Sequence, residues 1–339
     1  MAGFVDELQQ RVNALPGVRA AGVLRALPLA STIGDFAVDI DGFEESPGHE
    51  AKGHAQAASH GAFEAMGMRL VRGRWFTAAD TITSAPVAVV NETMARAYWS
   101  GPAEAVGGRI RLGSATNRPW ATVVGVVADE RHDGVTAIVR EKFFVPHIQW
   151  PVSTNGGDPI RSVFVVARTA VDPMDLAGAI RSEIRQLHAS LPVAEVRSMR
   201  EVVAASLATP RLTGFLLGAF AAIALALAAV GIYGVLAYVV SQRTAEIGIR
   251  MALGAERSQV LGAVLRHGLE LAAAGIGGGL IGALALTRLM QSILYEVAPN
   301  DPFTFAAVAA ALLLIALAAS LLPARRATRV SPTAAVRSQ

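Results

Sequence analysis

The sequence has no cysteine, which excludes disulfide bonds, thiolate metal ligands and a cysteine nucleophile. Lysine is almost absent as well, because Lys52 and Lys142 are the only two and arginine supplies the remaining basic charge. Acidic and basic residues are nearly equal in number before residue 212, so the high pI of about 9.7 comes from the rest of the chain. This distribution gives no reason to expect a nucleic-acid partner.

Long apolar runs fill the last third of the chain. Three of them contain no acidic or basic side chain, and they cover Leu212–Val240, Leu271–Thr287 and Pro302–Ala324. As a helix, the first run would be roughly 43 Å long at 1.5 Å per residue, which exceeds the roughly 30 Å hydrocarbon core of a bilayer. The other two runs are also long enough to span. The pattern predicts an integral membrane protein whose membrane domain is all-α, with three transmembrane helices.

The arginine residues predict the orientation of these spans. The loop between the second and third spans carries only Arg288, whereas eight arginines lie between the first two spans or after the third: Arg243, Arg250, Arg257, Arg266, Arg325, Arg326, Arg329 and Arg337. Because cytoplasmic loops are enriched in basic residues, residues 241–267 and the C-terminus are predicted to be cytoplasmic. Residues 1–211 are then extracytoplasmic.

The region before the first span is predicted to fold as an α+β domain. Met1–Leu15 has the apolar spacing of an amphipathic helix and lacks the basic and apolar regions of a signal peptide. Further helices are predicted at Gly61–Met66, Glu92–Trp99, Pro173–His188 with Asp172 as its N-cap, and Met199–Ala208. Strands are predicted at Val18–Arg25, Phe36–Ile40, Pro86–Val90, Arg109–Leu112, Ala121–Val127, Phe143–Val145, Ser162–Arg168 and Val193–Val196. The last two strands and the helix between them would form a βαβ-like unit over residues 162–197.

The cytoplasmic segment Arg243–Ala255 has the pattern of a short amphipathic helix. Glu246 and Arg250 are four residues apart and can pair, Ile247 and Met251 share an adjacent face, and Gly254 suits a helix terminus. The segment is predicted to lie at the membrane surface. Periodicity alone also allows a helix that does no more than anchor a loop.

Four glycines of the second span, Gly275, Gly278, Gly279 and Gly282, form two overlapping pairs of small residues spaced four apart. Because glycine lets helix backbones approach closely, this face is predicted to pack on a neighbouring span or on a second half of the membrane domain. Glu270 and Arg288 lie near opposite ends of the span. They are predicted to sit at the interfaces rather than to form an ion relay within the membrane.

Candidate catalytic and metal-binding residues are few. His49, His54 and His60 are close in sequence, but their spacing does not place three ligands on one helical face, and the surrounding Gly and Ala predict a solvated loop and strand. Ser31 and Ser59 are not in a nucleophile elbow. No catalytic residue, bound cofactor or metal ion is predicted, and the sequence does not reveal a substrate.

Several motifs resemble the FtsX-like permease domain of the macrolide-exporter (MacB) type of ABC transporter. In the last third they are AVGIYGVLAYVVSQRTAEIGIRMALGA (229–255), YEVAPNDPFTF (295–305) and LPARRATRVSPTAAVR (322–337). The earlier region resembles the periplasmic domain of that family in MGMRLVRGRWF (66–76), APVAVVNETMARAY (85–98), VGGRIRL (106–112) and WATVVGVVAD (120–129).

The resemblance implies an α+β MacB-like periplasmic domain over residues 1–205 and an FtsX-like transmembrane domain over residues 206–339, with spans at about 212–240, 269–290 and 303–323. It also implies the bacterial inner (plasma) membrane as the location. In such permeases a cytoplasmic helix docks into an ABC ATPase, and the residues that match it are Glu246, Ile247, Gly248, Arg250, Met251 and Gly254. The chain has no G-x-x-x-x-G-K-[ST] phosphate loop, so a separate ATPase would bind and hydrolyse ATP, and the chain itself would not be an enzyme.

The expected function is that of a permease subunit or fragment that couples ATP hydrolysis to movement of the extracytoplasmic domain in export or extraction. Expected partners are an ABC ATPase subunit, a second permease half or homodimer partner, and membrane lipid. A family unit begins with a membrane helix and a strand ahead of a helix resembling Phe4–Leu15, and the sequence lacks both. The chain is therefore expected to be the C-terminal unit of a duplicated permease, as in acidobacteria, without its first membrane helix. A membrane scaffold that regulates an outer partner such as a cell-wall hydrolase, and a nonfunctional gene fragment, remain alternatives.

Overall fold

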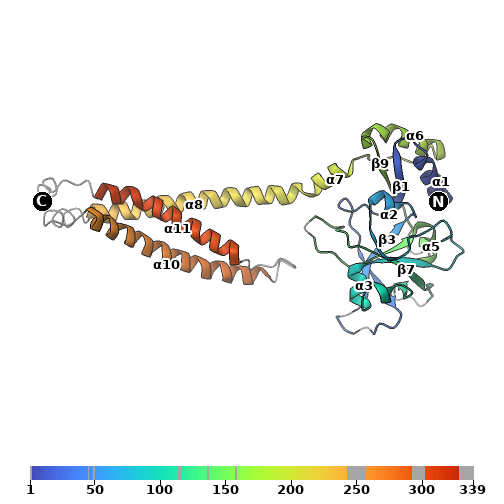
Figure 1. Ribbon diagram of the computed structural model, residues 1–339, viewed down its shortest axis with the longest axis horizontal. Helices are drawn as coiled ribbons and strands as arrows, with labels where there is room; N and C mark the ends of the chain where they lie inside the picture. Colours follow the sequence, from blue (N-terminus) through green and yellow to red (C-terminus); the bar gives the residue numbers. More distant parts are fainter. Residues whose placement is uncertain are drawn as a thin grey trace, which may run out of the picture. The chain divides into compact units, whose positions relative to one another are not determined.

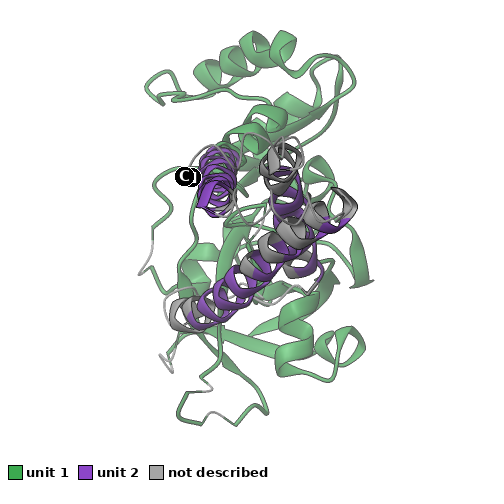
Figure 2. Ribbon diagram, turned by 90° about the vertical axis from the view of Figure 1, so that its left-hand side faces the viewer, with its two compact units in different colours: residues 1–210 green, residues 211–339 purple. Residues whose placement is uncertain are grey.

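The computed structural model describes residues 2–44, 46–48, 50–113, 117–135, 137–156, 159–242, 257–291 and 302–327. The chain divides into two compact units, unit 1 with residues 1–210 and unit 2 with residues 211–339 (Figure 2). Unit 1 is built around a nine-stranded mixed sheet, and unit 2 consists of long apolar helices. The α+β class predicted for the first region is confirmed.

The sheet of unit 1 closes on itself. Its order is β2-β6-β7-β5-β8-β3-β1-β9, with β4 on β7, and β2 also pairs with β3. Six strands therefore form a closed cycle, while β1 and β9 extend it from β3. The strands are β1 (Val18–Leu24), β2 (Asp35–Ile40), β3 (Lys52–Ala58), β4 (Leu70–Gly73), β5 (Val87–Asn91), β6 (Arg109–Leu112), β7 (Ala121–Val127), β8 (Lys142–Pro146) and β9 (Phe164–Thr169).

Short helices cover this sheet (Figure 1). They are α1 (Ala2–Asn13), α2 (Ala62–Met66), α3 (Glu92–Tyr98), α4 (Pro102–Ala105), α5 (Trp150–Ser153) and α6 (Ala177–Leu187), with 3₁₀ turns η1 (His147–Gln149) and η2 (Pro173–Leu176). Helix α7 (Met199–Ser206) follows them and leads into the apolar last third of the chain. The predicted amphipathic helix is α1, which buries Val5, Leu8 and Val12. The Asp172 side chain accepts a hydrogen bond from the Met174 amide, as expected of an N-cap.

Two apolar clusters form most of the core of unit 1. One includes Val90, Phe143 and Trp150, all almost fully buried. In the other, Phe63 stacks on Trp75 with their ring centroids 4.6 Å apart and packs edge-on against Phe144 at 5.2 Å. Aromatic and branched side chains on both faces of β8 account for this packing.

Helix α2 lies directly against β1 at Gly22. A Cβ atom at Gly22 would come within 2.2 Å of the Ala62 backbone nitrogen and 2.4 Å of the Ala62 Cα. Because these are backbone atoms, no side-chain rotation could relieve the clash. Glycine at this position therefore sets the distance between α2 and the sheet.

The sequence prediction is wrong at Val193–Val196, which is not a strand. Val193 instead packs against the apolar cluster formed by α1, α6 and β1. The neighbour of β9 is β1, which runs antiparallel to it, so the predicted βαβ-like unit does not form. Strand β4 was not predicted from the sequence, and for β3 the sequence predicted no more than a solvated strand near His54, without bounds.

Unit 2 contains α8 (Ala208–Gln242, which begins in unit 1), α10 (Arg257–Gln291) and α11 (Pro302–Ala327). Helices α10 and α11 lie side by side (Figure 1). All three apolar runs lie within these helices. Within the described residues, one helical stretch, Met199–Val239, is long and apolar enough to cross a membrane, and α10 and α11 hold the shorter apolar segments Ala272–Ala285 and Ala306–Ala319.

Candidate functional site

A groove of about 500 Å³ lies between α8, α10 and α11. Among the described residues, every lining side chain is apolar, and glycine contributes two lining positions. The lining residues are Ala228 and Ile232 of α8, Ala272, Gly275, Ile276, Gly279, Leu280 and Ala283 of α10, and Val308, Ala309, Leu312 and Ala316 of α11.

The four glycines singled out in the sequence all lie on α10. Gly275 and Gly279 line the groove, whereas Gly278 and Gly282 do not. At each of the four positions an added Cβ atom would meet no heavy atom of the described residues within 4 Å. The glycine face of α10 is therefore open, and half of it forms the floor of the groove.

The predicted coupling residues Glu246, Ile247, Gly248, Arg250, Met251 and Gly254 lie outside the described residues. The helices that flank the segment are described: α8 ends at Gln242 and α10 begins at Arg257. Near the end of α8, the Gln242 side-chain amide donates a hydrogen bond to the Tyr238 hydroxyl at 2.7 Å. On α10, Arg266 and Glu270 form an exposed ion pair at 3.1 Å, one helical turn apart.

Unit 1 contains a buried polar cluster at the start of β8. Lys142, only 2% exposed, forms an ion pair with Glu130, and its ammonium group lies 3.0 Å from Nδ1 of His132. Because an ammonium can only donate, His132 Nδ1 accepts and Nε2 carries the ring proton. This Nε2 is buried and has no hydrogen-bond partner within the described part of the chain.

His54 on β3 belongs to the same cluster. Its Nε2 lies 3.1 Å from Asp35 and its Nδ1 lies 3.8 Å from Asp133, and its ring packs edge-on against His132. His54 is 4% exposed, so the sequence prediction that it lies on a solvated strand is wrong. The His54 ring is covered by the side chains around it, those of His132, Asp35 and Asp133. Among the residues whose structure is described, no group of three or more His, Cys, Asp or Glu side chains could hold a metal ion.

Burial dominates the electrostatics of this cluster. Burial, together with the nearby positive charge of Lys142, lowers the pKa of His132 to about 3. Burial also lowers the pKa of His54, although the carboxylates of Asp133 and Asp35 oppose the change. The same effect lowers the pKa of Lys142 against the opposing influence of Glu130. Both histidines are therefore neutral near pH 7.

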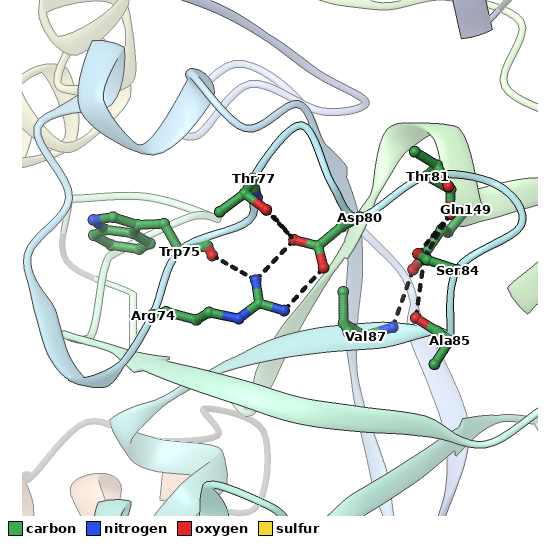
Figure 3. A network of polar contacts seen from close by, with 9 residues as sticks. All are labelled: Arg74, Trp75, Thr77, Asp80, Thr81, Ser84, Ala85, Val87 and Gln149. Carbon is green, nitrogen blue, oxygen red and sulfur yellow. Dashed lines mark hydrogen bonds and ion pairs between the residues drawn. The ribbon is translucent and has the colours of Figure 1, made fainter.

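A second polar network holds the loop between β4 and β5 at both ends (Figure 3). The Arg74 guanidinium donates to both carboxylate oxygens of Asp80, at 2.8 and 2.9 Å. At the other end the Gln149 amide donates to the Thr81 carbonyl at 2.9 Å and accepts from the Val87 amide at 3.0 Å. Burial alone would raise the pKa of Asp80, but the hydrogen bonds from Arg74 and Thr77 outweigh it and hold that pKa below its usual value. The loop is thus a fixed part of the surface of unit 1.

The sequence interpretation missed the Lys142 cluster because its members are dispersed along the chain. Glu130 and His132 lie on an irregular segment, and the parallel pairing of β3 with β8 brings His54 beside Lys142. The only local signal is a lysine, rare in this chain, directly before the apolar run of β8.

Comparisons with known proteins match both units in order. The sequence pattern of the MacB-like periplasmic core domain matches residues 4–183, and that of the FtsX-like permease C-terminal domain matches residues 218–332. The chain is 28% identical over 270 residues to the pyoverdine export ATP-binding/permease protein PvdT of Pseudomonas syringae pv. syringae, covering 80% of this chain and 40% of PvdT. It is 29% identical over 274 residues to the macrolide export ATP-binding/permease protein MacB of Rhodospirillum rubrum, covering 78% of this chain and 40% of MacB.

The chain thus spans about 40% of the length of these relatives. Among solved structures, it is similar to the periplasmic region of MacB from Actinobacillus actinomycetemcomitans, with 15% identity, a TM-score of 0.38, and coverage of 54% of this chain and 73% of that one. Because the periplasmic-domain pattern alone matches more than half of the chain and the permease pattern follows it, the chain belongs to the FtsX-like, MacB-type family of ABC transporter permeases.

Proposed function

We propose that this chain is the permease part of an ABC-type export or extraction system and transmits ATP-driven movement to an extracytoplasmic domain. A separate ATPase binds and hydrolyses ATP on the cytoplasmic side. Unit 1 then changes its arrangement on the outer side, where the substrate is handled. The order of the two family domains supports this assignment, and the names of the two relatives, which include export and ATP-binding, point to the same class of system.

The observation that carries the proposal is the helical stretch Met199–Val239. A capping box sets its start: the Ser198 hydroxyl accepts from the Glu201 amide, and the Glu201 carboxylate accepts from the Ser198 amide. Leu207, between α7 and α8, keeps helical backbone angles of φ −87° and ψ −10°. In the proposed mechanism, movement of the membrane helices passes along this stretch of the chain to unit 1.

The proposed location is the bacterial inner membrane, with α8, α10 and α11 as three spans. Large apolar side chains on α8 support this: Phe215, Phe220 and Leu227 are 72%, 67% and 67% exposed. Such surface is costly in water and favourable in lipid. The arginine distribution supports residues 1–211 outside and residues 241–267 and the C-terminus in the cytoplasm.

The proposed contact with the ATPase is the segment Arg243–Ala255. Its residues Glu246, Ile247, Gly248, Arg250, Met251 and Gly254 match the docking helix of the family. A second permease half or a second copy of the chain would present an equivalent segment to the other ATPase subunit. The small-residue face of α10 is a candidate contact between such halves.

The test reconstitutes the chain in proteoliposomes with the ATPase that co-purifies with it. Glu246→Arg and Met251→Asp should reduce ATPase-driven activity to the uncoupled level. The first reverses a charge at the docking surface, and the second places a carboxylate on its apolar face. Gln259→Ala, outside the motif, serves as the control and should retain activity. Tryptophan fluorescence reports whether unit 1 stays folded, since Trp75, Trp99, Trp120 and Trp150 all belong to it.

Unchanged activity in Glu246→Arg and Met251→Asp would refute the coupling role. Co-purification of the chain without any ATPase would refute the transport assignment. An ATPase whose turnover responds to a protein partner and to no transported compound would instead favour the regulatory scaffold.

A further inference from the structure

The outer edge of β9 is open. Within the described residues, β9 pairs with β1 alone. Val23 of β1 lies opposite Val165, but its amide donates to the Ser59 hydroxyl and its carbonyl accepts from the Ser59 amide, so both groups point away from β9. In an antiparallel pair the amide and carbonyl of Val165, and those of Ala167 two residues on, then point to the outer edge. Among the hydrogen bonds between described backbone groups, none reaches them there.

Residues 191–197, which we call the strap, lie between α6 and α7 without backbone pairing of their own. They belong to no helix or strand, and no hydrogen bond between described backbone groups involves residues 192–197. Val193 packs against the apolar cluster that Val165 and Ala167 also contact. One apolar side chain therefore holds the strap on the same face of the sheet as α1 and α6.

The order of the elements suits a parallel strand at this edge. β9 is followed by η2 and α6 and then by the strap, with three residues in each connection. Connections of this length are usual between strands and helices. A strand–helix–strand unit places its second strand parallel to the first, so the chain can bring the strap alongside β9 with α6 as the crossover.

The strap also has the backbone groups that the open edge needs. With Val193 kept on its present face, it lies opposite Val165 in a parallel pair. The groups that then face β9 are the carbonyls of Pro192 and Ala194 and the amides of Ala194 and Val196. Proline has no amide proton, but this pairing uses only its carbonyl. The strap can therefore bond to both outward-facing residues of β9.

We propose that the strap closes onto the outer edge of β9 as a parallel strand, and that the structure shows its open form. Closing gives the outward peptide groups of β9 the partners that an unpaired edge lacks. It also fixes Ser198, the N-cap of α7, beside the sheet. Because α7 leads into α8, closing ties unit 1 to the first proposed membrane helix, a consequence that rests on the proposed function.

Disulfide formation in the full chain in phospholipid vesicles measures closure, because the native chain has no cysteine. In the closed form Arg168 of β9 lies opposite Val196, and neighbouring strands bring such Cα atoms within disulfide range. Arg168→Cys/Val196→Cys should therefore form a disulfide under mild oxidation. Arg168→Cys/Ala189→Cys, whose second cysteine lies ahead of the strap, gives the background rate.

Two proline substitutions test whether closure depends on backbone pairing. Added to the Arg168→Cys/Val196→Cys chain, Ala194→Pro removes an amide that faces β9 and should slow disulfide formation about five-fold or more. Glu195→Pro, at the next residue, removes an amide that faces away from β9 and should change the rate by less than about two-fold. The two variants form a matched pair, since both place proline in the middle of the strap.

A rate for Arg168→Cys/Val196→Cys no higher than the background overturns the proposal, and so do equal rates in the two proline variants. These measurements need no ATPase, so they are independent of the proposed function. If the disulfide forms while Glu246→Arg leaves ATPase-driven activity unchanged, the strap stands and the coupling role fails. If the oxidised chain keeps full ATPase-driven activity, the strap takes no part in transmitting movement.

Discussion

The buried histidines of unit 1 make its free energy of unfolding depend on pH. His132 and His54 are held neutral by burial beside Lys142. In the unfolded chain a histidine has a pKa of about 6.5, so it binds a proton below that pH while the folded state does not. Stability therefore falls as the pH drops below about 6.5, and for His132 the loss continues down to its folded pKa of about 3.

We predict that the free energy of unfolding of unit 1 decreases from about pH 6.5 to about pH 5, by about 1.4 kcal/mol per pH unit for each histidine that stays neutral in the folded state. His132→Asn should make this slope shallower by about that amount, because it removes one titrating group. The measurement is urea unfolding of the full chain followed by tryptophan fluorescence at several pH values.

Asp80→Asn is the control for this pH series. The pKa of Asp80 is lowered, so its contribution is present above its ordinary value of 3.8 and is lost only below it. The variant should lower stability throughout but leave the slope between about pH 6.5 and about pH 5 unchanged. A slope that is the same in His132→Asn as in the unmodified chain would disprove the assignment.

At the scale of single elements, the sequence predicted the strands that consist of branched apolar side chains. The valine-rich runs of β5 and β7 are typical of buried strands, and the helix α1 follows directly from its apolar spacing. Strand β3, with the sequence KGHAQAA, carries no such signal. It is a strand because its backbone pairs with β8, β2 and β1. Its small residues fit the close neighbours, since a Cβ atom at Gly53 would lie 3.3 Å from the Glu141 carbonyl oxygen and from the Phe143 ring.

The polar cluster around Lys142 depends on strand pairing even more than the strands themselves do. Lys142, Glu130 and His54 come together only once β3 and β8 pair, which no local pattern encodes. The sequence singled out the glycines of α10 as a close-packing face. It did not predict the groove, because the other two walls come from α8 and α11. The coupling residues between Gln242 and Arg257 remain a prediction from sequence and family resemblance.

The close contact between α2 and β1 predicts that adding a methyl group at Gly22 destabilises unit 1. Gly22→Ala should lower the free energy of unfolding by about 3 kcal/mol or more, at the upper end of overpacking costs, because the added Cβ meets backbone atoms that cannot rotate away. Gly34→Ala, where an added Cβ meets nothing within 4 Å, should change stability by no more than about 0.5 kcal/mol. Urea midpoints from tryptophan fluorescence compare the two, and equal midpoints would show that α2 can shift on the sheet.

For the whole molecule, the orientation of the spans can be tested by single-cysteine labelling, because the unmodified chain has no cysteine. Thr83→Cys lies on the exposed loop of unit 1, and Gln259→Cys lies near the start of α10. In intact cells a membrane-impermeant maleimide should label Thr83→Cys, and it should label Gln259→Cys only after permeabilisation. The reverse pattern would contradict the predicted topology, and the cysteine-free chain gives the background.

The two lysines of unit 1 differ in exposure, so their relative reactivity reports local opening of the sheet. Lys52 is largely exposed, whereas Lys142 is enclosed where β8 pairs with β3 and β5. An amine-reactive reagent meets Lys52 at once but reaches Lys142 only when the strands around it separate. The ratio of the acylation rate of Lys142 to that of Lys52 therefore measures how often the strands around Lys142 separate. The native sequence allows this measurement without any added probe.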